Sequence, residues 1–443
     1  MRAFSRKVFK SKIAHNAASL YLVQGCRKLL PLFTLPYLAR VLGPSGWGDV
    51  AFTQSMGDFI SIFVEFGFAL SATRGIAQNR DSKEECGRIA VGTFGAQATL
   101  AVVAVVIALA VSPLIPLLRL HPLLLCAGLV YGAAQGMAPI WLFQGLERMT
   151  LAATLEVCSK IAAVGAIFLF VHSPRDEWKV LAFQCLAPVV AVLVGIWMAY
   201  RLLSLYLPTV AMVWHSIRMG WPMFLLRSGA ASYSVCNVLI LAMFAPASIV
   251  GYFASAEKVV KAITGLLLPI RDAFYPRLSQ LAAHSADENK RLTRLSAVIE
   301  IGFGLFLTIA TFAGAHFIVR IVFGNNFEAA VPIMKILSVI PLLTSLGDAI
   351  GFQSLIPAGK ESMVTMAILL GGIFNVTCAV LLAPHFQGIG MAVSVDIAEI
   401  VVCTGLLFMV ARTTTFFRKG SAAHAGTVSF APAIIKVPTR TGE

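Results

Sequence analysis

Charged residues are scarce in this chain. Only 13% of its 443 residues are charged and 58% are hydrophobic, whereas a typical soluble domain has roughly a quarter charged and half apolar residues. The mean hydropathy is +0.83. A soluble domain with this composition would expose far too much apolar surface to water, so the sequence predicts an integral membrane protein.

Motifs for covalent chemistry and for metal binding are also missing. The eight cysteines form no C-x-x-C pair and the eight histidines form no H-E-x-x-H motif; no P-loop, G-x-S-x-G or dinucleotide fingerprint occurs. The cysteines are interpreted as small apolar packing residues. We therefore predict that the protein is not an enzyme and that it has no metal site or bound cofactor.

Apolar windows that could each cross a bilayer follow one another along the whole chain. A helix of about 20 residues spans a hydrocarbon core about 30 Å thick. About twelve such windows can be placed, near residues 16–38, 49–70, 89–112, 121–142, 151–171, 180–202, 219–243, 248–270, 297–319, 331–356, 362–384 and 388–411. The sequence thus predicts an all-α membrane protein and leaves no room for a soluble catalytic domain.

Lysine and arginine are distributed unequally between the two ends of these windows, and cytoplasmic loops normally hold the excess. The side that holds both termini carries most of them, including Arg2, Arg6, Lys7, Lys10, Lys12, Arg74, Arg80, Lys83, Arg88, Arg271, Arg277, Lys290, Arg291 and Arg294. The opposite side carries only Arg40, Arg119, Arg175, Lys179 and Arg320. We predict that both termini are cytoplasmic. The net charge of +14 is then charge that faces an anionic leaflet, and we predict no nucleic-acid partner.

Two segments repeat one pattern half a chain apart. Residues 48–74 and 251–277 both open with G-x-x-A and both reach an arginine after the same interval. A second echo follows in the same order, with FQGL at 143–146 and FQSL at 352–355. This register matches Ala51 with Ala254, Gln54 with Glu257, Asp58 with Lys261 and Ser61 with Thr264. The repeat predicts two six-helix bundles that are related by a pseudo-twofold axis along the membrane normal.

The chain is accordingly divided into five parts: a basic cytoplasmic N-terminus at 1–15, an N-terminal bundle at 16–204, a cytoplasmic inter-bundle loop at 205–218, a C-terminal bundle at 219–411 and a disordered cytoplasmic tail at 412–443. Membrane transporters built from two repeats normally bind their substrate between the repeats, near mid-membrane. We expect the second and eighth windows, which carry the repeat, to form the cavity wall.

Charged and polar side chains inside the windows are the candidate site residues. A charge at the bilayer centre costs about 2.5–3.5 kcal/mol even on the lenient insertion scale, so these side chains should face protein or water. The candidate substrate-binding residues are Arg27, Arg227, Lys258 and Lys261, and the candidate coupling or cavity-lining residues are Gln54, Asp58, Glu65, Glu257, Asp396 and Glu399.

A structural role stays open for one of these pairs. Glu257 and Lys261 are four residues apart in the order that favours an ion pair on one helix. Glu156 and Lys160 repeat this spacing in the fifth window, and we interpret them mainly as a structural pair.

Four stretches carry a family resemblance: LPYLARVLGPSGWGDVAFTQ (35–54), EFGFALSATR (65–74), PIWLFQGLERM (139–149) and AEKVVKAITGLLLPIRDAFYPRLS (256–279). Together they resemble the polysaccharide transporter family of bacterial flippases, the O-antigen unit (Wzx-like) type, within the multidrug/oligosaccharidyl-lipid/polysaccharide exporter superfamily. The resemblance extends from about residue 10 to about residue 412, nearly the whole chain.

This resemblance implies a flippase of the bacterial inner membrane. Its substrate would be an undecaprenyl-diphosphate-linked oligosaccharide unit, moved from the cytoplasmic to the periplasmic leaflet by alternating access for O-antigen, capsule or exopolysaccharide assembly. A polysaccharide polymerase, a chain-length regulator and membrane lipids are the implied partners, and a proton or sodium gradient could drive the transport. Physical chemistry agrees that an anionic diphosphate needs fixed cations on its path through hydrocarbon.

Two other functions stay open. A cation-coupled drug or small-molecule antiporter of the same superfamily would share the architecture. A membrane polysaccharide polymerase would be an enzyme, and we would expect it to show a large periplasmic loop or a paired catalytic constellation, neither of which the sequence contains.

Overall fold

The computed structural model describes residues 2–114, 119, 121–204 and 206–421, without the side chains of 2–32, 114, 226–234, 283, 284, 286 and 412–421. The described chain is helical and contains no strand. Its α-helices are α1 (Arg2–Glu65), α2 (Phe68–Gln78), α3 (Lys83–Val111), α5 (Pro122–Met137), α6 (Ile140–Gly145), α7 (Met149–Phe170), α8 (Glu177–Gln184), α9 (Leu186–Leu202), α10 (Val210–Phe244), α11 (Ala247–Thr264), α12 (Leu268–His284), α13 (Ala286–Val322), α14 (Ala330–Leu337), α15 (Ile340–Ile350) and α16 (Glu361–Ser421). Short turns of 3₁₀ or π-helix are η1 (Ser112–Leu114), η2 (Pro174–Asp176), η3 (Gly265–Leu267), η4 (Asn325–Phe327) and η5 (Gly351–Leu355).

All twelve predicted windows fall on these helices, which confirms the all-α membrane fold. Eight helical stretches of the described residues are long and apolar enough to cross a membrane, and two of these contain a break that divides them. The remaining two windows lie on α10 and α11; in α11 the charges of Glu257, Lys258 and Lys261 interrupt the apolar sequence. Part of the stretch predicted as the inter-bundle loop is helical, since α10 begins at Val210. The predicted disordered tail lies, from residue 422 onward, outside the described residues.

A break divides each of the two longest helices. In α1 the backbone leaves the helical region at Gly43, with φ 68° and ψ 179°, a conformation that glycine adopts at little cost. Proline follows at position 44, and a residue before proline is pushed out of the helical region. In α16 the break lies at Gln387, with φ 48°, three residues after Pro384. Each break joins two antiparallel membrane segments.

Small residues allow α1 and α5 to pack closely. Gly128, Gly132 and Gly136 follow one another at intervals of four along α5. A Cβ atom added at Gly132 would lie 2.6 Å from the carbonyl oxygen of Gly57 on α1, and one added at Gly136 would lie 2.5 Å from Cβ of Val64. Close backbone approach at small residues is the usual way in which membrane helices associate, because lipid offers no hydrophobic drive for it.

The two repeat helices cross each other at their glycines. A Cβ atom added at Gly48 on α1 would lie 1.8 Å from the carbonyl oxygen of Ala247, and one added at Gly251 on α11 would lie 2.1 Å from the carbonyl oxygen of Pro44. Gly48 matches Gly251 in the repeat, and Pro44 matches Ala247 in the same register. The contact is therefore the same when the two halves are exchanged, which places the pseudo-twofold axis at this crossing.

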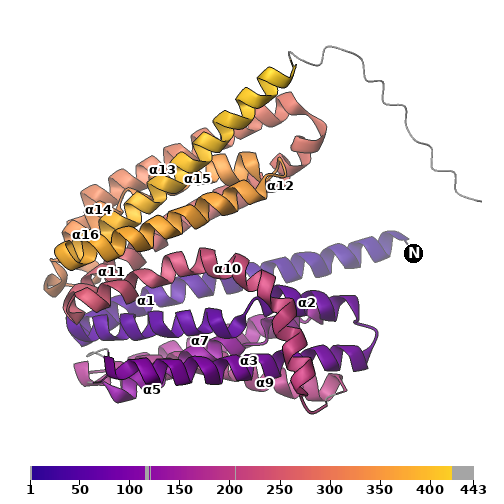
Figure 1. Ribbon diagram of the computed structural model, residues 1–443, viewed down its shortest axis with the longest axis horizontal. Coiled ribbons are helices and arrows are strands. Elements are labelled where there is room, and N and C mark those ends of the chain that lie inside the picture. The colour runs from indigo at the N-terminus through magenta and orange to yellow at the C-terminus, as the bar shows by residue number, and fades with distance from the viewer. Residues whose placement is uncertain (1, 115–118, 120, 205, 422–443) are drawn as a thin grey trace, which may run out of the picture.

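Figure 1 shows the consequence for the shape of the molecule. The helices before α10 form one group and those after α11 form the other. The first part of α10 runs beside α2 and α3 in the first group, and its second part lies with α11 between the two groups. The two groups converge at the left of the view and diverge toward the right, where the N-terminus lies. We call the end that contains Gly43, Gly48 and Gly251 the crossing end, and the opposite end, which contains the α2–α3 turn, the open end.

Candidate functional site

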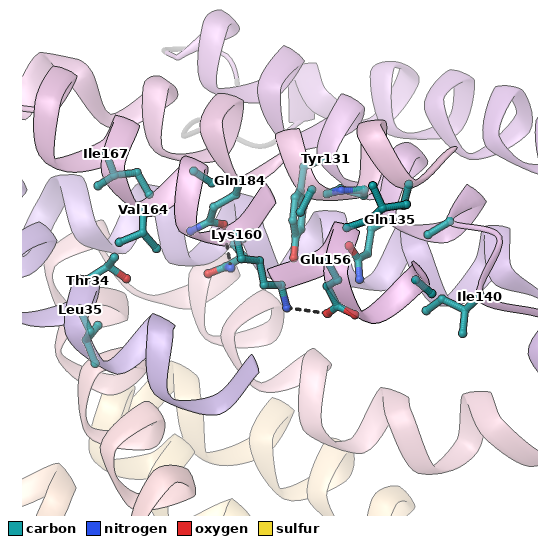
Figure 2. Close-up of a pocket in the computed structure, with 18 of the residues that line it drawn as sticks. Thr34, Leu35, Tyr131, Gln135, Ile140, Glu156, Lys160, Val164, Ile167 and Gln184 are labelled. Atoms are coloured by element: carbon teal, nitrogen blue, oxygen red, sulfur yellow. Dashed lines mark hydrogen bonds and ion pairs between the residues drawn. The ribbon is translucent and has the colours of Figure 1, made fainter. Parts of the chain in front are cut away.

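A cavity of about 250 Å³ lies in the N-terminal half, and among the described side chains Lys258 is contributed by the other half. Its polar wall comprises Gln54 on α1, Tyr131 and Gln135 on α5, Glu156 and Lys160 on α7, Gln184 on α8, and Lys258 on α11. Figure 2 shows Tyr131, Gln135 and Gln184 arranged around the Glu156–Lys160 pair. The remaining wall is largely apolar and includes Trp47, Leu38 and Ile167. Apolar walls with a few convergent polar groups are typical of small-molecule sites.

Lys258 links the two halves at this cavity. Its Nζ donates a hydrogen bond to Oε1 of Gln54 at 2.8 Å, and Nε2 of Gln54 donates to Oε1 of Gln184 at 3.1 Å. The ammonium also lies 4.5 Å from the ring centroid of Trp47, within the range of a cation–π interaction. Lys258 thus brings a positive charge to a wall that the N-terminal half otherwise forms.

The second cation of the wall is paired. Nζ of Lys160 lies 2.9 Å from Oε1 of Glu156, one helical turn away on α7, and about a third of the lysine side chain is exposed. The structure thus shows the ion pair that the spacing predicts. It also places this pair on the cavity wall, where both charged groups can contact a bound molecule.

Asp58 lies behind the wall. The hydroxyl of Tyr131, itself a wall residue, donates to Oδ1 of Asp58 at 2.9 Å. Asp58 is one turn beyond Gln54 on α1, so the two predicted cavity residues occupy different places: Gln54 is on the wall, and Asp58 positions the tyrosine.

Glu257 and Lys261 belong to a chain of polar contacts that lies outside the cavity wall. Oε1 of Glu257 lies 3.0 Å from Nζ of Lys261 and accepts a hydrogen bond from Asn237 on α10 at 3.0 Å. Asn375 on α16 donates in turn to Asn237 at 2.7 Å. The Glu257 side chain is 7% exposed and that of Lys261 is 50% exposed. This chain ties α10, α11 and α16 together, so the geometry favours the structural interpretation of the pair.

One further predicted residue, Glu65, lies away from the cavity wall. Oε1 of Glu65 accepts a hydrogen bond from the backbone nitrogen of Ala69 at 3.1 Å, where it satisfies a free amide in the first turn of α2. Arg27 on α1 and Arg227 on α10 belong to described helices, but their side chains lie outside the described residues.

A second group of ionisable side chains lies in the C-terminal half. Glu300 on α13 is fully buried and accepts a hydrogen bond from Gln353. Asp348 on α15 lies 3.8 Å from the guanidinium of Arg271. Asp396 on α16 keeps a buried carboxylate oxygen that has no hydrogen-bond partner among the described residues, and Glu399 lies one turn further along the same helix. The predicted acids Asp396 and Glu399 thus do not border the cavity and form a separate acidic cluster with Asp348.

Sequence reasoning missed several of these positions. Trp47, Tyr131, Gln135 and Gln184 were not predicted as cavity residues, although Tyr131 and Gln135 are one helical turn apart inside an apolar window. Glu300 was also missed: it is the fourth residue of the ninth window, where an acid can be taken for part of the flanking polar loop.

Comparison with known proteins identifies the family of the chain. The family model described as polysaccharide biosynthesis protein matches residues 13–282. A protein of Escherichia coli (strain K12) named "Putative O-antigen transporter" is 29% identical over 410 residues, which cover 91% of this chain and 97% of the relative.

Two solved structures share the fold. The inward closed conformation of the lipid II flippase MurJ has a TM-score of 0.74 at 14% identity and covers 90% of this chain and 87% of its own. An inward-facing multidrug resistance MATE family transporter has a TM-score of 0.64 at 15% identity and covers 88% of this chain and 96% of its own.

Proposed function

This chain belongs to the polysaccharide biosynthesis protein family, and from that membership we propose that it is a flippase for lipid-linked oligosaccharides. The substrate in this proposal is an undecaprenyl-diphosphate-linked repeat unit, moved from the cytoplasmic to the periplasmic leaflet. The fold shared with a lipid II flippase and the O-antigen transporter named among the relatives both support it. Assembly of O-antigen, capsule or exopolysaccharide is the pathway class.

The observation that carries the proposal is the composition of the cavity wall. Trp47 and Tyr131 offer aromatic faces on which the C–H face of a sugar ring can stack, and Gln54, Gln135 and Gln184 offer amide donors and acceptors for its hydroxyl groups.

The size of the cavity restricts what it holds. Its volume of about 250 Å³ is slightly below the roughly 300–1,000 Å³ of typical ligand pockets. It therefore fits one sugar ring or the diphosphate with its first substituent, and the rest of the repeat unit extends toward the open end.

Lys258 is the proposed diphosphate ligand. It stands on the wall at the junction of the halves and is held by Gln54, whereas Lys261 one turn away contacts Glu257. Ammonium groups bind phosphate oxygens strongly when water is largely excluded. Lys261, Arg27 and Arg227 stay predicted contributors of positive charge, and the cavity wall adds Lys160 to them.

We place the crossing end in the periplasm and the open end in the cytoplasm of a bacterial inner membrane. The excess of Lys and Arg at the loops of the open end supports this orientation. In a cysteine-free chain, we expect Ser45→Cys at the crossing end to react with a membrane-impermeant maleimide in intact spheroplasts. Lys290→Cys at the open end should react only after the membrane is broken. The reverse pattern would overturn the orientation.

Transport coupled to a proton or sodium gradient stays a prediction, and Asp396 and Glu399 are the proposed coupling acids. The buried, unpartnered oxygen of Asp396 supports this assignment, since intramembrane carboxylates commonly mark ion pathways. A polysaccharide polymerase and a chain-length regulator stay the proposed protein partners.

The antiporter alternative receives support from the shared MATE fold. The cavity argues against it, because Lys258 and Lys160 outnumber the single carboxylate of Glu156 on the wall. A site for cationic drugs would need the opposite balance.

The proposal is tested in cells by deleting the gene. We expect lipid-linked repeat units to accumulate on the cytoplasmic leaflet while the sugar-transfer reactions that build them continue. Leaflet position is measured by adding an impermeant glycosidase to spheroplasts and to inverted vesicles. If the units of the deletion strain were cleaved in spheroplasts as in the parent strain, the proposed function would be wrong.

A further inference from the structure

Three ionisable side chains from distant parts of the sequence meet at the crossing end. Asp49 follows the crossing glycine Gly48 on α1, His121 immediately precedes α5, and Glu177 is the first residue of α8. One ligand atom from each of the three lies within 4.8 Å of the other two. None of the three belongs to the cavity wall. None of them was predicted from the sequence as a site residue.

The geometry of the group leaves room for an ion. Nδ1 of His121 contacts Oε1 of Glu177 at ion-pair distance. Nε2 of the same ring lies 3.9 Å from Oδ2 of Asp49, which is too far for a hydrogen bond. A Zn²⁺ ion, with bonds of about 2.0–2.2 Å to imidazole nitrogen and to carboxylate oxygen, bridges a separation of this size.

The charge of the group also favours a bound cation. The Asp49 and Glu177 side chains are 8% and 10% exposed, and no lysine or arginine of the described residues lies within ion-pair distance of either. The Asp49 carboxylate makes no hydrogen bond to any described group, although it is more than nine-tenths buried and directed at His121. Even with a protonated imidazole the group would carry a net negative charge, and an uncompensated buried charge is costly.

We propose that Asp49, His121 and Glu177 bind one divalent transition-metal ion, with Zn²⁺ as the best match. Imidazole nitrogen and carboxylate oxygen are both zinc ligands, whereas Mg²⁺ and Ca²⁺ prefer oxygen ligands alone. Binding requires the Glu177 carboxylate to exchange its contact with Nδ1 of His121 for a bond to the ion. The His121 side chain is 37% exposed, so the ion enters from the aqueous side of the crossing end, and water completes its coordination.

The bound ion would stabilise the contacts between α1, α5 and α8 at the crossing end. It links α5 and α8 to the residue of α1 that follows Gly48, where α1 meets Ala247 of the other half. This inference goes beyond the proposed function and does not depend on it, because the ion contacts neither the cavity nor the substrate.

Zinc binding to the purified, untagged full-length chain in detergent tests the proposal. After the chain is stripped with a chelator, we expect it to bind one Zn²⁺, as measured by mass spectrometry of the gel-filtered protein. Competition with a fluorescent zinc indicator should show affinity reduced roughly 100-fold or more in Asp49→Asn and in Glu177→Gln, since losing even an outer-shell partner of a zinc ligand costs about 10- to 100-fold. The matched control is His172→Gln, which removes an exposed imidazole at the same end and should leave binding unchanged.

A second readout separates lost binding from lost folding. Zn²⁺ should raise the thermal midpoint of the wild type and of His172→Gln, because an ion that binds only the folded state stabilises it. It should leave the midpoints of Asp49→Asn and Glu177→Gln unchanged, although both elute as monodisperse protein. Absence of stoichiometric zinc in the wild type, displacement of zinc by equal concentrations of Mg²⁺, or unchanged affinity in both variants would each overturn the proposal.

Discussion

Lys258→Met is expected to lower the transport rate by roughly 10- to 150-fold without loss of membrane-inserted protein. Lys258 is the cation that the C-terminal half contributes to the cavity wall. A hydrogen bond to a charged partner contributes about 1.5–3 kcal/mol, and each 1.4 kcal/mol corresponds to about a tenfold change. The methionine is similar in length and apolar, so it removes the charge with little change in side-chain volume. Surface polysaccharide, quantified at matched membrane levels of the protein, measures the effect.

The control for this experiment lies on the same helix. Lys261 is one turn from Lys258 and contacts Glu257, so the double variant Glu257→Gln with Lys261→Met removes the positive charge of Lys261 without leaving an unpaired carboxylate. The amide oxygen introduced at position 257 can still accept from Asn237, which donates to Glu257 in the structure. Apolar replacement of a buried pair is often tolerated, and we expect this variant to keep most of its transport. If the double variant failed while Lys258→Met functioned, Lys261 would replace Lys258 as the proposed diphosphate ligand.

Gly48→Ala is the second substitution with a large expected effect. The added methyl group would lie 1.8 Å from the carbonyl oxygen of Ala247, so α1 and α11 would have to move apart. Overpacking of this kind costs about 1–3 kcal/mol, which corresponds to a shift of roughly 5- to 150-fold in an equilibrium. We expect the crossing end to stay open and the transport rate to fall accordingly. Gly251→Ala should have the same effect, because the two glycines are equivalent in the repeat.

Solvent access to the cavity measures this opening. In a cysteine-free chain, Gln54→Cys places a thiol on the cavity wall, and an impermeant maleimide is added from the crossing side. The thiol should react faster in the Gly48→Ala background than in its parent. Gly302→Ala on α13 is the matched control, since a Cβ atom there meets nothing within 4 Å. Equal reaction rates in all three backgrounds would contradict a gate at the crossing.

The helices and the repeat could be predicted from the sequence because both depend on local or periodic features. Apolar windows define membrane helices whatever their neighbours are, and the matched segments 48–74 and 251–277 are visible in the sequence as a repeat. The contact between Gly48 and Gly251 at the crossing was not predicted. The breaks at Gly43 and Gln387 are different: only the first has a local signal, a glycine before proline. At Gln387 the backbone conformation follows from the packing of the two segments of α16.

The cavity was harder to predict because its wall depends on helix rotation. Glu257, Lys258 and Lys261 are within four residues of one another, and their charges alone gave no reason to separate them. In the structure a turn of about 100° per residue directs Lys258 toward Gln54 and Lys261 toward Glu257. Gln135 and Gln184 escaped prediction because uncharged amides interrupt an apolar window only slightly.

Movement of a lipid-linked oligosaccharide between leaflets by the purified protein tests the central claim most directly. Liposomes with an undecaprenyl-diphosphate oligosaccharide in both leaflets are reconstituted with the wild type, with Lys258→Met, or without protein. An impermeant glycosidase is then added outside. The account predicts that the wild type exposes nearly all of the labelled sugar to cleavage within a time in which Lys258→Met and protein-free liposomes still protect most of the inner-leaflet half. Protection of the same half by correctly inserted wild-type protein would contradict the account.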